Sequence, residues 1–165
     1  ENILKKFGLS VITNNYQSFS NGEDRKIIDI KRDDFYLKIL PLICYEIIYS
    51  GKIFKNPSFD LMVNISEDGW FGSSIGPKQH FAHSIFRAVE SGKYLIRSSN
   101  NGIAAIINPL GKIEKIINFG QSGYVDLEGS KSIQPTIFSK FGNKIFLMLI
   151  LLYIFLIFSF NKFKK

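Results

Sequence analysis

Cys44, the only cysteine of this 165-residue chain, is the side chain best suited to nucleophilic chemistry. It follows the apolar run Leu40–Ile43 and lies two residues before Glu46. A thiolate is a strong nucleophile, and a cysteine placed where a strand leads into a helix has a lowered thiol pKa. A lone cysteine in an apolar run is also common as a buried structural residue. The local sequence therefore leaves both interpretations of Cys44 open.

The other residues with chemical potential favour structural roles. His80 and His83 are three residues apart, and the sequence has no cluster of cysteine and histidine with zinc spacing, so we expect neither a metal nor a cofactor. Arg87 and Glu90 are also three residues apart, which places them on one face of a helix. We interpret that pair as a structural ion pair rather than as catalytic groups.

The pattern of apolar residues predicts an α/β fold that must position Cys44. Apolar runs predict strands over 26–30, 35–46, 59–66 and 93–99, and a hairpin formed by 103–108 and 112–117. Helical spacing predicts a helix over 78–92, with Pro77 in its first turn and Gly92 at its end. Strands this apolar need cover on both faces, which one helix cannot supply. We therefore expect part of a larger sheet, whose other strands are missing or belong to another chain.

Composition narrows the class of protein. Hydrophobic residues make up 45% of the chain and charged residues 21%, which indicates a globular rather than a disordered protein. The net charge of +7 is compatible with nucleic acid or an anionic membrane as partner. Basic residues are spread along the chain and do not cluster before the C-terminus, so we expect no nucleic-acid partner.

The C-terminal segment predicts a membrane helix. Residues 145–160 are all apolar or aromatic except Ser159, whereas a buried helix of a globular domain shows an apolar stripe. We predict a domain over 1–135, a transmembrane helix over 141–160 and a basic tail over 161–165. By the positive-inside rule the lysines of that tail place the C-terminus in the cytoplasm and the domain on the periplasmic side.

Three segments read together resemble a known family. They are Ile43–Glu46 ("ICYE"), Asn64–His80 ("NISEDGWFGSSIGPKQH") and Arg87–Ile106 ("RAVESGKYLIRSSNNGIAAI"). They resemble the nitrilase, or carbon–nitrogen hydrolase, superfamily and, within it, the bacterial apolipoprotein N-acyltransferase family. The motifs have the order and spacing of that family, a terminal apolar span follows them, and Ser18–Gly22 resembles a loop that precedes its cysteine strand.

The resemblance implies a fold, a reaction and a set of site residues. The fold would be the C-terminal part of an α-β-β-α sandwich followed by one transmembrane helix, in the bacterial inner membrane. The reaction would transfer an acyl chain from a phospholipid donor, through a cysteine thioester, to the N-terminal amine of a diacylglyceryl-cysteine lipoprotein acceptor. The aligned residues are Cys44 as nucleophile, Glu46 as a second catalytic-site residue, and Tyr45, Trp70 and Phe71 at the substrate.

The chain also departs from the family's pattern. The superfamily uses a Glu-Lys-Cys triad, and neither the Glu nor the Lys segment can be recognised in these 165 residues; Lys5 and Lys6 lack the neighbours of the catalytic lysine. Glu67 and Gly69 replace an Asn and an Ala of the family's loop. The first residue is Glu1, and we expect the sequence to start partway into a longer ancestral protein.

These departures leave several functions open. The chain can be the C-terminal portion of an acyltransferase, either truncated or completed by a second chain that bears the Glu and Lys. It can instead be a catalytically inactive, membrane-anchored remnant or partner subunit, or a nitrilase-family amidase. We expect the 165-residue chain alone to be inactive or very weakly active, because losing triad members slows catalysis by many powers of ten.

Overall fold

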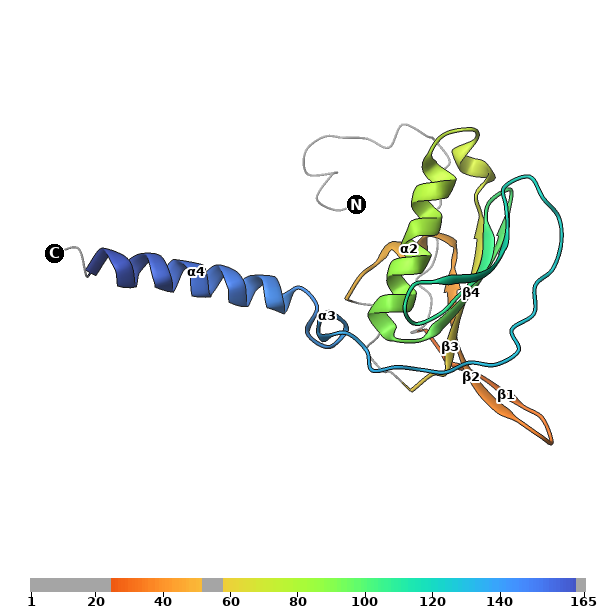
Figure 1. The fold of residues 1–165 in the computed structure, drawn as a ribbon, viewed down its shortest axis with the longest axis horizontal. Coiled ribbons are helices and arrows are strands. Elements are labelled where there is room, and N and C mark those ends of the chain that lie inside the picture. The colour runs from red at the N-terminus through yellow and green to blue at the C-terminus, as the bar shows by residue number, and fades with distance from the viewer. Residues whose placement is uncertain (1–24, 52–57, 163–165) are drawn as a thin grey trace, which may run out of the picture.

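The computed structural model describes residues 25–51 and 58–162, with side chains to residue 160, and places six strands in one sheet (Figure 1). The strands, which are neighbours in chain order, are β1 (Ile28–Lys31), β2 (Tyr36–Ile43), β3 (Leu61–Glu67), β4 (Tyr94–Asn100), β5 (Ala104–Ile107) and β6 (Ile113–Ile117). β2, β3 and β4 run parallel, and the other neighbours pair antiparallel. The predicted α/β class and all of the predicted strands are therefore confirmed.

β2 is shorter than the strand predicted over 35–46. It ends at Ile43, and the next residue, Cys44, has a φ of +47° and begins the short 3-10 helix η1 (Cys44–Ile48). A residue in this left-handed region cannot continue a strand. The apolar run therefore contains a strand and a turn, and the cysteine begins the turn.

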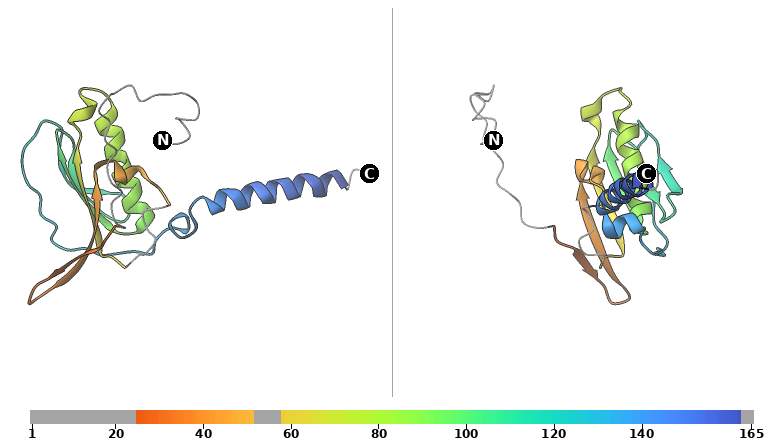
Figure 2. Two further views of the ribbon diagram at one scale, coloured as in Figure 1. Left: turned by 180° about the vertical axis from the view of Figure 1, so that it is seen from behind. Right: turned by 90° about the vertical axis from the view of Figure 1, so that its left-hand side faces the viewer.

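Helix α2 (Gly76–Ser91) matches the predicted helix and packs on one face of the sheet (Figures 1 and 2). Pro77 lies in its first turn, where a missing N–H costs nothing, and the Ser74 hydroxyl accepts a hydrogen bond from the Gly76 N–H. Gly92 ends the helix with a φ of +65°, a conformation that glycine adopts without strain.

The hydrophobic core lies between α2 and the sheet. Its buried residues are Leu40, Leu42, Ile47, Phe59, Met62, Phe81, Ala88, Leu95, Ala105 and Ile107. On the opposite face, Ile43 and Ile65 are 61% and 57% exposed. The described residues thus contain one sheet covered by one helix, which is two of the four layers expected of the sandwich.

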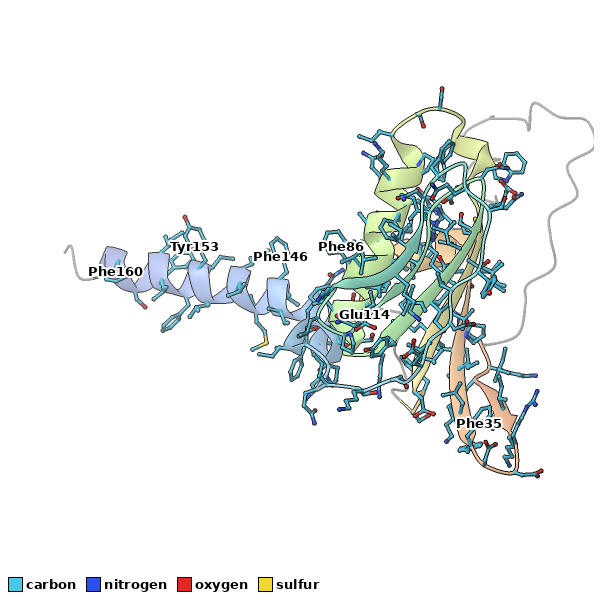
Figure 3. The ribbon with its side chains drawn as sticks, turned by 45° about the vertical axis from the view of Figure 1, so that its right-hand side comes forward. Phe35, Phe86, Glu114, Phe146, Tyr153 and Phe160 are labelled. Atoms are coloured by element: carbon cyan, nitrogen blue, oxygen red, sulfur yellow. The ribbon has the colours of Figure 1, made fainter. Side chains whose placement is uncertain are left out.

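The C-terminal part leaves the sheet as two helices. α3 (Ile137–Phe141) is followed by Gly142, with a φ of +54°, and then by α4 (Lys144–Lys162), which projects away from the sheet (Figures 1 and 2). Phe146 and Tyr153, seven residues apart, project from the same side of α4 (Figure 3). The consecutive residues Leu147, Met148 and Leu149 are exposed as well, so apolar side chains cover the other sides of the helix too. Within the described part of the chain, no helix combines the length and the hydropathy that crossing a membrane requires.

Candidate active site

Cys44 lies at the carboxyl edge of the parallel strands. Ile43, the last residue of β2, is paired with Ile65 of β3, so Cys44 comes next to Ser66. The cysteine is neither buried nor fully exposed. Its positive φ is uncommon for a side chain with a Cβ, and such strained conformations occur often at functional sites. Ligands of open α/β sheets bind at this edge, so the position suits a nucleophile.

The turn that carries Cys44 is held from β3 by Asn64. The Asn64 side-chain amide donates to the carbonyl of Leu42 at 3.0 Å and to that of Cys44 at 3.3 Å. Asn64 is fully buried, and its own carbonyl accepts from Arg97. Because both ends of the Asn64 amide are bonded, the cysteine backbone is fixed relative to the neighbouring strand.

A buried group of charged and polar residues lies beside Cys44, and we call Asp68, His80 and Arg97 the buried cluster. Arg97 Nη2 donates to both carboxylate oxygens of Asp68, at 2.8 and 3.0 Å, and Asp68 Oδ1 is 2.8 Å from His80 Nδ1. The Ser66 hydroxyl connects this cluster to the cysteine. Its Oγ is 3.0 Å from Asp68 Oδ1 and 3.7 Å from Cys44 Sγ.

The short contact with Asp68 assigns the proton on His80. A carboxylate oxygen 2.8 Å from Nδ1 requires an N–H there, so Nδ1 donates to Asp68. Arg97 Nη2, at 3.2 Å from Nδ1, then has Asp68 as its acceptor. Nε2 is buried and has no hydrogen-bond partner among the described residues.

The electrostatics of the site favour an ionised Asp68. Burial raises the pKa of its carboxyl, but the hydrogen bonds and charge of Arg97, together with hydrogen bonds from His80 and Ser99, outweigh burial and lower that pKa. The pKa of the adjacent Glu67 is also lowered, first by the Gly69 N–H. Glu67 is on the opposite side of β3 from Ser66, because side chains alternate along a strand.

A pocket of about 440 Å³ opens between η1 and α2, next to the cysteine turn. Tyr45 and Phe71 lie on its wall and pack on the His80 ring, with ring centroids 5.5 and 5.6 Å away. Phe86 of α2 also lines the pocket. Its side chain projects from the side of the helix away from the sheet (Figure 3). His83 lines the pocket too, and burial, followed by the positive charge of Arg87, lowers the pKa of His83.

The structure brings four of the five predicted site residues close to one another and places the fifth, Trp70, apart from them. Cys44, Tyr45 and Glu46 share η1, and Phe71 meets Tyr45 across His80. Trp70 is 87% exposed and does not line the pocket.

The Glu46 side chain binds the backbone at the start of its own helix, η1. Its carboxylate accepts from the Ile43 N–H at 2.7 Å and forms a 2.7 Å ion pair with Arg25. A carboxylate near the first turn of a helix is favourable. These contacts stabilise the turn in which Cys44 lies.

Arg87 and Glu90 form the predicted structural ion pair. Their side chains are buried, and Nη1 of the arginine is 2.7 Å from Oε2 of the glutamate. The other Glu90 oxygen accepts from the Gly51 N–H at 2.7 Å, so the pair ties α2 to the segment that follows η1. The predicted ion pair is therefore confirmed.

The sequence interpretation missed Asn64, Ser66, Asp68 and Arg97. Their signal was present: polar residues at alternate positions 64, 66 and 68 continue one face of an apolar strand, and Arg97 interrupts another apolar strand. Because the strands pair in parallel, Asn64 comes opposite Arg97. The structure also places the Asp68 carboxylate on His80, a contact that the sequence interpretation did not include. Among the described residues, no three metal-ligating side chains come together.

Comparison with known proteins identifies relatives of the chain. Residues 10–134 match the carbon-nitrogen hydrolase family. The chain is 47% identical over 127 residues to the apolipoprotein N-acyltransferase of Rickettsia bellii, covering 76% of this chain and 25% of the relative. It is 46% identical over 122 residues to that of Rickettsia prowazekii, covering 73% and 24%. The chain thus spans about a quarter of the length of these curated relatives.

A solved structure supports the fold. Nit3 of Saccharomyces cerevisiae, a member of branch 10 of the nitrilase superfamily, superposes with a TM-score of 0.51 at 23% identity. The superposition covers 62% of this chain and 40% of Nit3. The described sheet and its covering helix therefore have a nitrilase-like arrangement.

Proposed function

Because the chain belongs to the carbon-nitrogen hydrolase family, we propose that it carries the cysteine-bearing part of an apolipoprotein N-acyltransferase. The observation that carries the proposal is the position of Cys44: at the carboxyl edge of the parallel strands, in a left-handed turn beside a pocket. Relatives that are 46% and 47% identical bear that name, and the aligned segment of each contains about a quarter of the enzyme.

In the proposed reaction Cys44 acts twice. Its thiolate attacks the ester carbonyl of a phospholipid, so that a C–S bond forms, the C–O bond breaks and the lysophospholipid leaves with a proton. The free amine of a diacylglyceryl-cysteine lipoprotein then attacks the thioester. A C–N bond forms, the C–S bond breaks, and the cysteine returns to its starting state as the amine loses a proton.

We assign the neighbouring residues supporting roles. Tyr45 and Phe71, on the wall of the pocket, contact the substrate, and the pocket's aromatic lining suits an apolar chain. Glu46 supports catalysis by holding the turn of Cys44 in shape. Trp70, in the exposed loop, contacts lipid at the membrane surface, where the indole offers a large apolar area and one N–H.

We further propose that the chain acts at the bacterial inner membrane, with α4 as its anchor. The supporting observation is that α4 exposes apolar side chains along its length (Figure 3) and, among the described elements, packs chiefly on α3. The predicted transmembrane segment over 141–160 and its orientation, with the domain on the periplasmic side, remain part of this proposal. An anchor confines the site to the surface where both lipid substrates reside.

The direct test is a chimera. The segment of this chain that aligns with the Rickettsia bellii relative replaces the corresponding segment of that enzyme, and the chimera is expressed in cells depleted of their own acyltransferase. We expect it to restore N-acylation of lipoproteins, read out by mass spectrometry of their N-termini. The matched control is the same chimera with Cys44→Ala. If the chimera folds and inserts but restores nothing, the chain is an inactive remnant or has a different substrate.

The 165-residue chain alone is expected to behave differently from the chimera. It lacks a recognisable Glu and Lys of the family's triad, so we expect no detectable acylation of lipoproteins in the same cells. Restored acylation by the chain alone would show that those two groups are dispensable or are provided within this sequence.

A further inference from the structure

Among the described residues, the Ser66 hydroxyl is the one side-chain group that forms a hydrogen bond with the Cys44 sulfur. Its Oγ is 3.7 Å from Sγ, a long distance for a hydrogen bond to sulfur. The same oxygen is 3.0 Å from Asp68 Oδ1, and Ser66 is buried. A serine hydroxyl has one proton to donate and two lone pairs that accept. Ser66 can therefore donate to only one of these two neighbours at a time.

The charge state of Cys44 determines whether the Ser66 hydroxyl donates its proton to Asp68 or to the sulfur. While the cysteine is a neutral thiol, the Ser66 proton goes to the carboxylate of Asp68, because a charged acceptor at the shorter distance is stronger. A lone pair of Oγ then remains for the S–H of Cys44. When the S–H proton is lost to solvent, the sulfur becomes a charged acceptor and can take the Ser66 proton. Asp68 keeps its bonds from Arg97 and His80 in both states.

We propose that Ser66 is a positioning residue for Cys44, whose hydroxyl accepts from the neutral thiol and donates to the thiolate. The buried cluster holds Ser66 in place for both states. Asp68, which follows β3, and His80 of α2 contact the Ser66 hydroxyl, at 3.0 and 3.5 Å. Arg97 of β4 bonds Asp68 and so holds the carboxylate in place. This inference rests on the proposed nucleophilic role of Cys44, and it assigns a partner to a thiol whose own helix is a single short turn.

The other charges around the cysteine are largely paired. In η1, Glu46 is bound by Arg25, and Tyr45 is its neutral neighbour. In the buried cluster, Asp68 is bound by Arg97 and by the Nδ1–H of His80. Glu67 is on the opposite side of β3 and accepts from Gly69 and Asn100. Removing the neutral Ser66 hydroxyl therefore removes its contact with the sulfur and its hydrogen bond to Asp68, while the ion pair of Asp68 with Arg97 and the bond from His80 remain.

The test measures alkylation of the full 165-residue chain in detergent micelles. Cys44 is the only cysteine, so the rate of iodoacetamide uptake reports on that thiol alone. Below the midpoint of the rate–pH profile the rate follows the thiolate fraction. We expect Ser66→Ala to lower the rate there by roughly threefold to tenfold, the equivalent of one hydrogen bond, and to leave the high-pH plateau unchanged.

Two further variants separate this role from a structural one. Ser66→Thr keeps the hydroxyl and should retain the wild-type profile. Ser91→Ala removes a buried serine hydroxyl that bonds only to backbone carbonyls of α2, so its profile should also match the wild type. Asp68→Asn should shift the midpoint to lower pH, because it removes a negative charge and frees the Ser66 proton for the sulfur.

A rate loss in Ser66→Ala that is confined to pH values below the midpoint, together with a wild-type profile for Ser66→Thr, supports the proposal. A Ser66→Ala profile that superposes on the wild type, or that drops by the same factor at every pH, overturns it. If Ser66→Ala does not fold, Ser66→Thr is compared with Ser66→Val, which has nearly the same volume and no hydroxyl, and coincident rate–pH profiles of these two variants overturn the proposal. Alkylation needs no phospholipid, so an acylation failure of the chimera would reject the proposed function and leave this result standing.

Discussion

At the scale of single residues, the site depends on charges that are buried and paired. Arg97 is 1% exposed and bonds Asp68, Asn64 and the carbonyl of Ile103, and the carboxylate of Asp68 is also fully buried. Such a pair contributes little net stability relative to apolar residues of the same volume. Removal of one partner, however, leaves the other charge buried and uncompensated.

Arg97→Met should therefore destabilise the protein severely. We expect the free energy of unfolding to fall by about 3–5 kcal/mol, because the Asp68 carboxylate loses its cation. The matched control is Lys115→Met, which removes the cation of the solvent-exposed pair with Glu128 and should cost less than about 1 kcal/mol. Urea unfolding of both variants in the same detergent measures the difference, and equal effects would contradict this account.

Stability should also depend on pH through Asp68. Its pKa is lower in the folded chain than in the unfolded chain, so ionised Asp68 stabilises the fold. This contribution is fully present above the unfolded pKa of about 3.9 and is lost as the pH falls through the folded pKa. The free energy of unfolding of the wild type should thus fall with acidification in that window. In Asp68→Asn the fall should be smaller, and an unchanged slope would argue against an ionised Asp68.

At the scale of secondary-structure elements, the sequence predicted most of the fold. Apolar runs located the strands, and helical spacing with Pro77 and Gly92 located α2. The turn at Cys44 could not be predicted, because nothing in the apolar run marks the residue at which the backbone takes a positive φ. The polar positions of the buried cluster were visible in the apolar strands, but the contact between Asp68 and Arg97, which are 29 residues apart, follows only from the pairing of β3 with β4.

The turn between β4 and β5 closes over this cluster and has no room for a larger residue. A Cβ on Gly102 would collide with the Asp68 carboxylate and the Ser99 hydroxyl. We expect Gly102→Ala to lower the free energy of unfolding by roughly 1–3 kcal/mol, as overpacking of a well-packed site does. The control is Gly129→Ala, at a position with no neighbouring atom within 4 Å, which should change stability little. Comparable losses in both variants would show that Gly102 is not confined.

At the scale of the whole molecule, two apolar surfaces stand out. One is the face of the sheet opposite α2, where Ile43 and Ile65 are exposed. The other is α4, which extends away from the sheet (Figure 2). Its exposed apolar side chains occupy consecutive positions and therefore all sides of the helix. A globular protein rarely exposes apolar patches of this extent without an interaction that covers them. The proposed membrane anchor would cover the second of these surfaces.

A charge in the middle of α4 should weaken membrane association. Leu152→Asp places a carboxylate among apolar side chains, and a charge at the centre of a membrane helix costs about 2.5–3.5 kcal/mol. We expect a larger fraction of this variant to be extracted from membranes by alkaline carbonate. Leu110→Asp, at an exposed leucine in the turn between β5 and β6, is the matched control and should be extracted like the wild type. Identical extraction of both variants would contradict the anchor.

The measurement that tests the central claim most directly is the identification of the acylated residue. The purified chimera is incubated with a phospholipid carrying a labelled acyl chain, in the absence of a lipoprotein acceptor, and analysed by peptide mass spectrometry. We predict one labelled acyl group on Cys44, released by hydroxylamine as a thioester is, and no label in the Cys44→Ala chimera. A label on a different residue, or N-acylation of lipoproteins by the Cys44→Ala chimera, would contradict the assignment of Cys44 as the nucleophile.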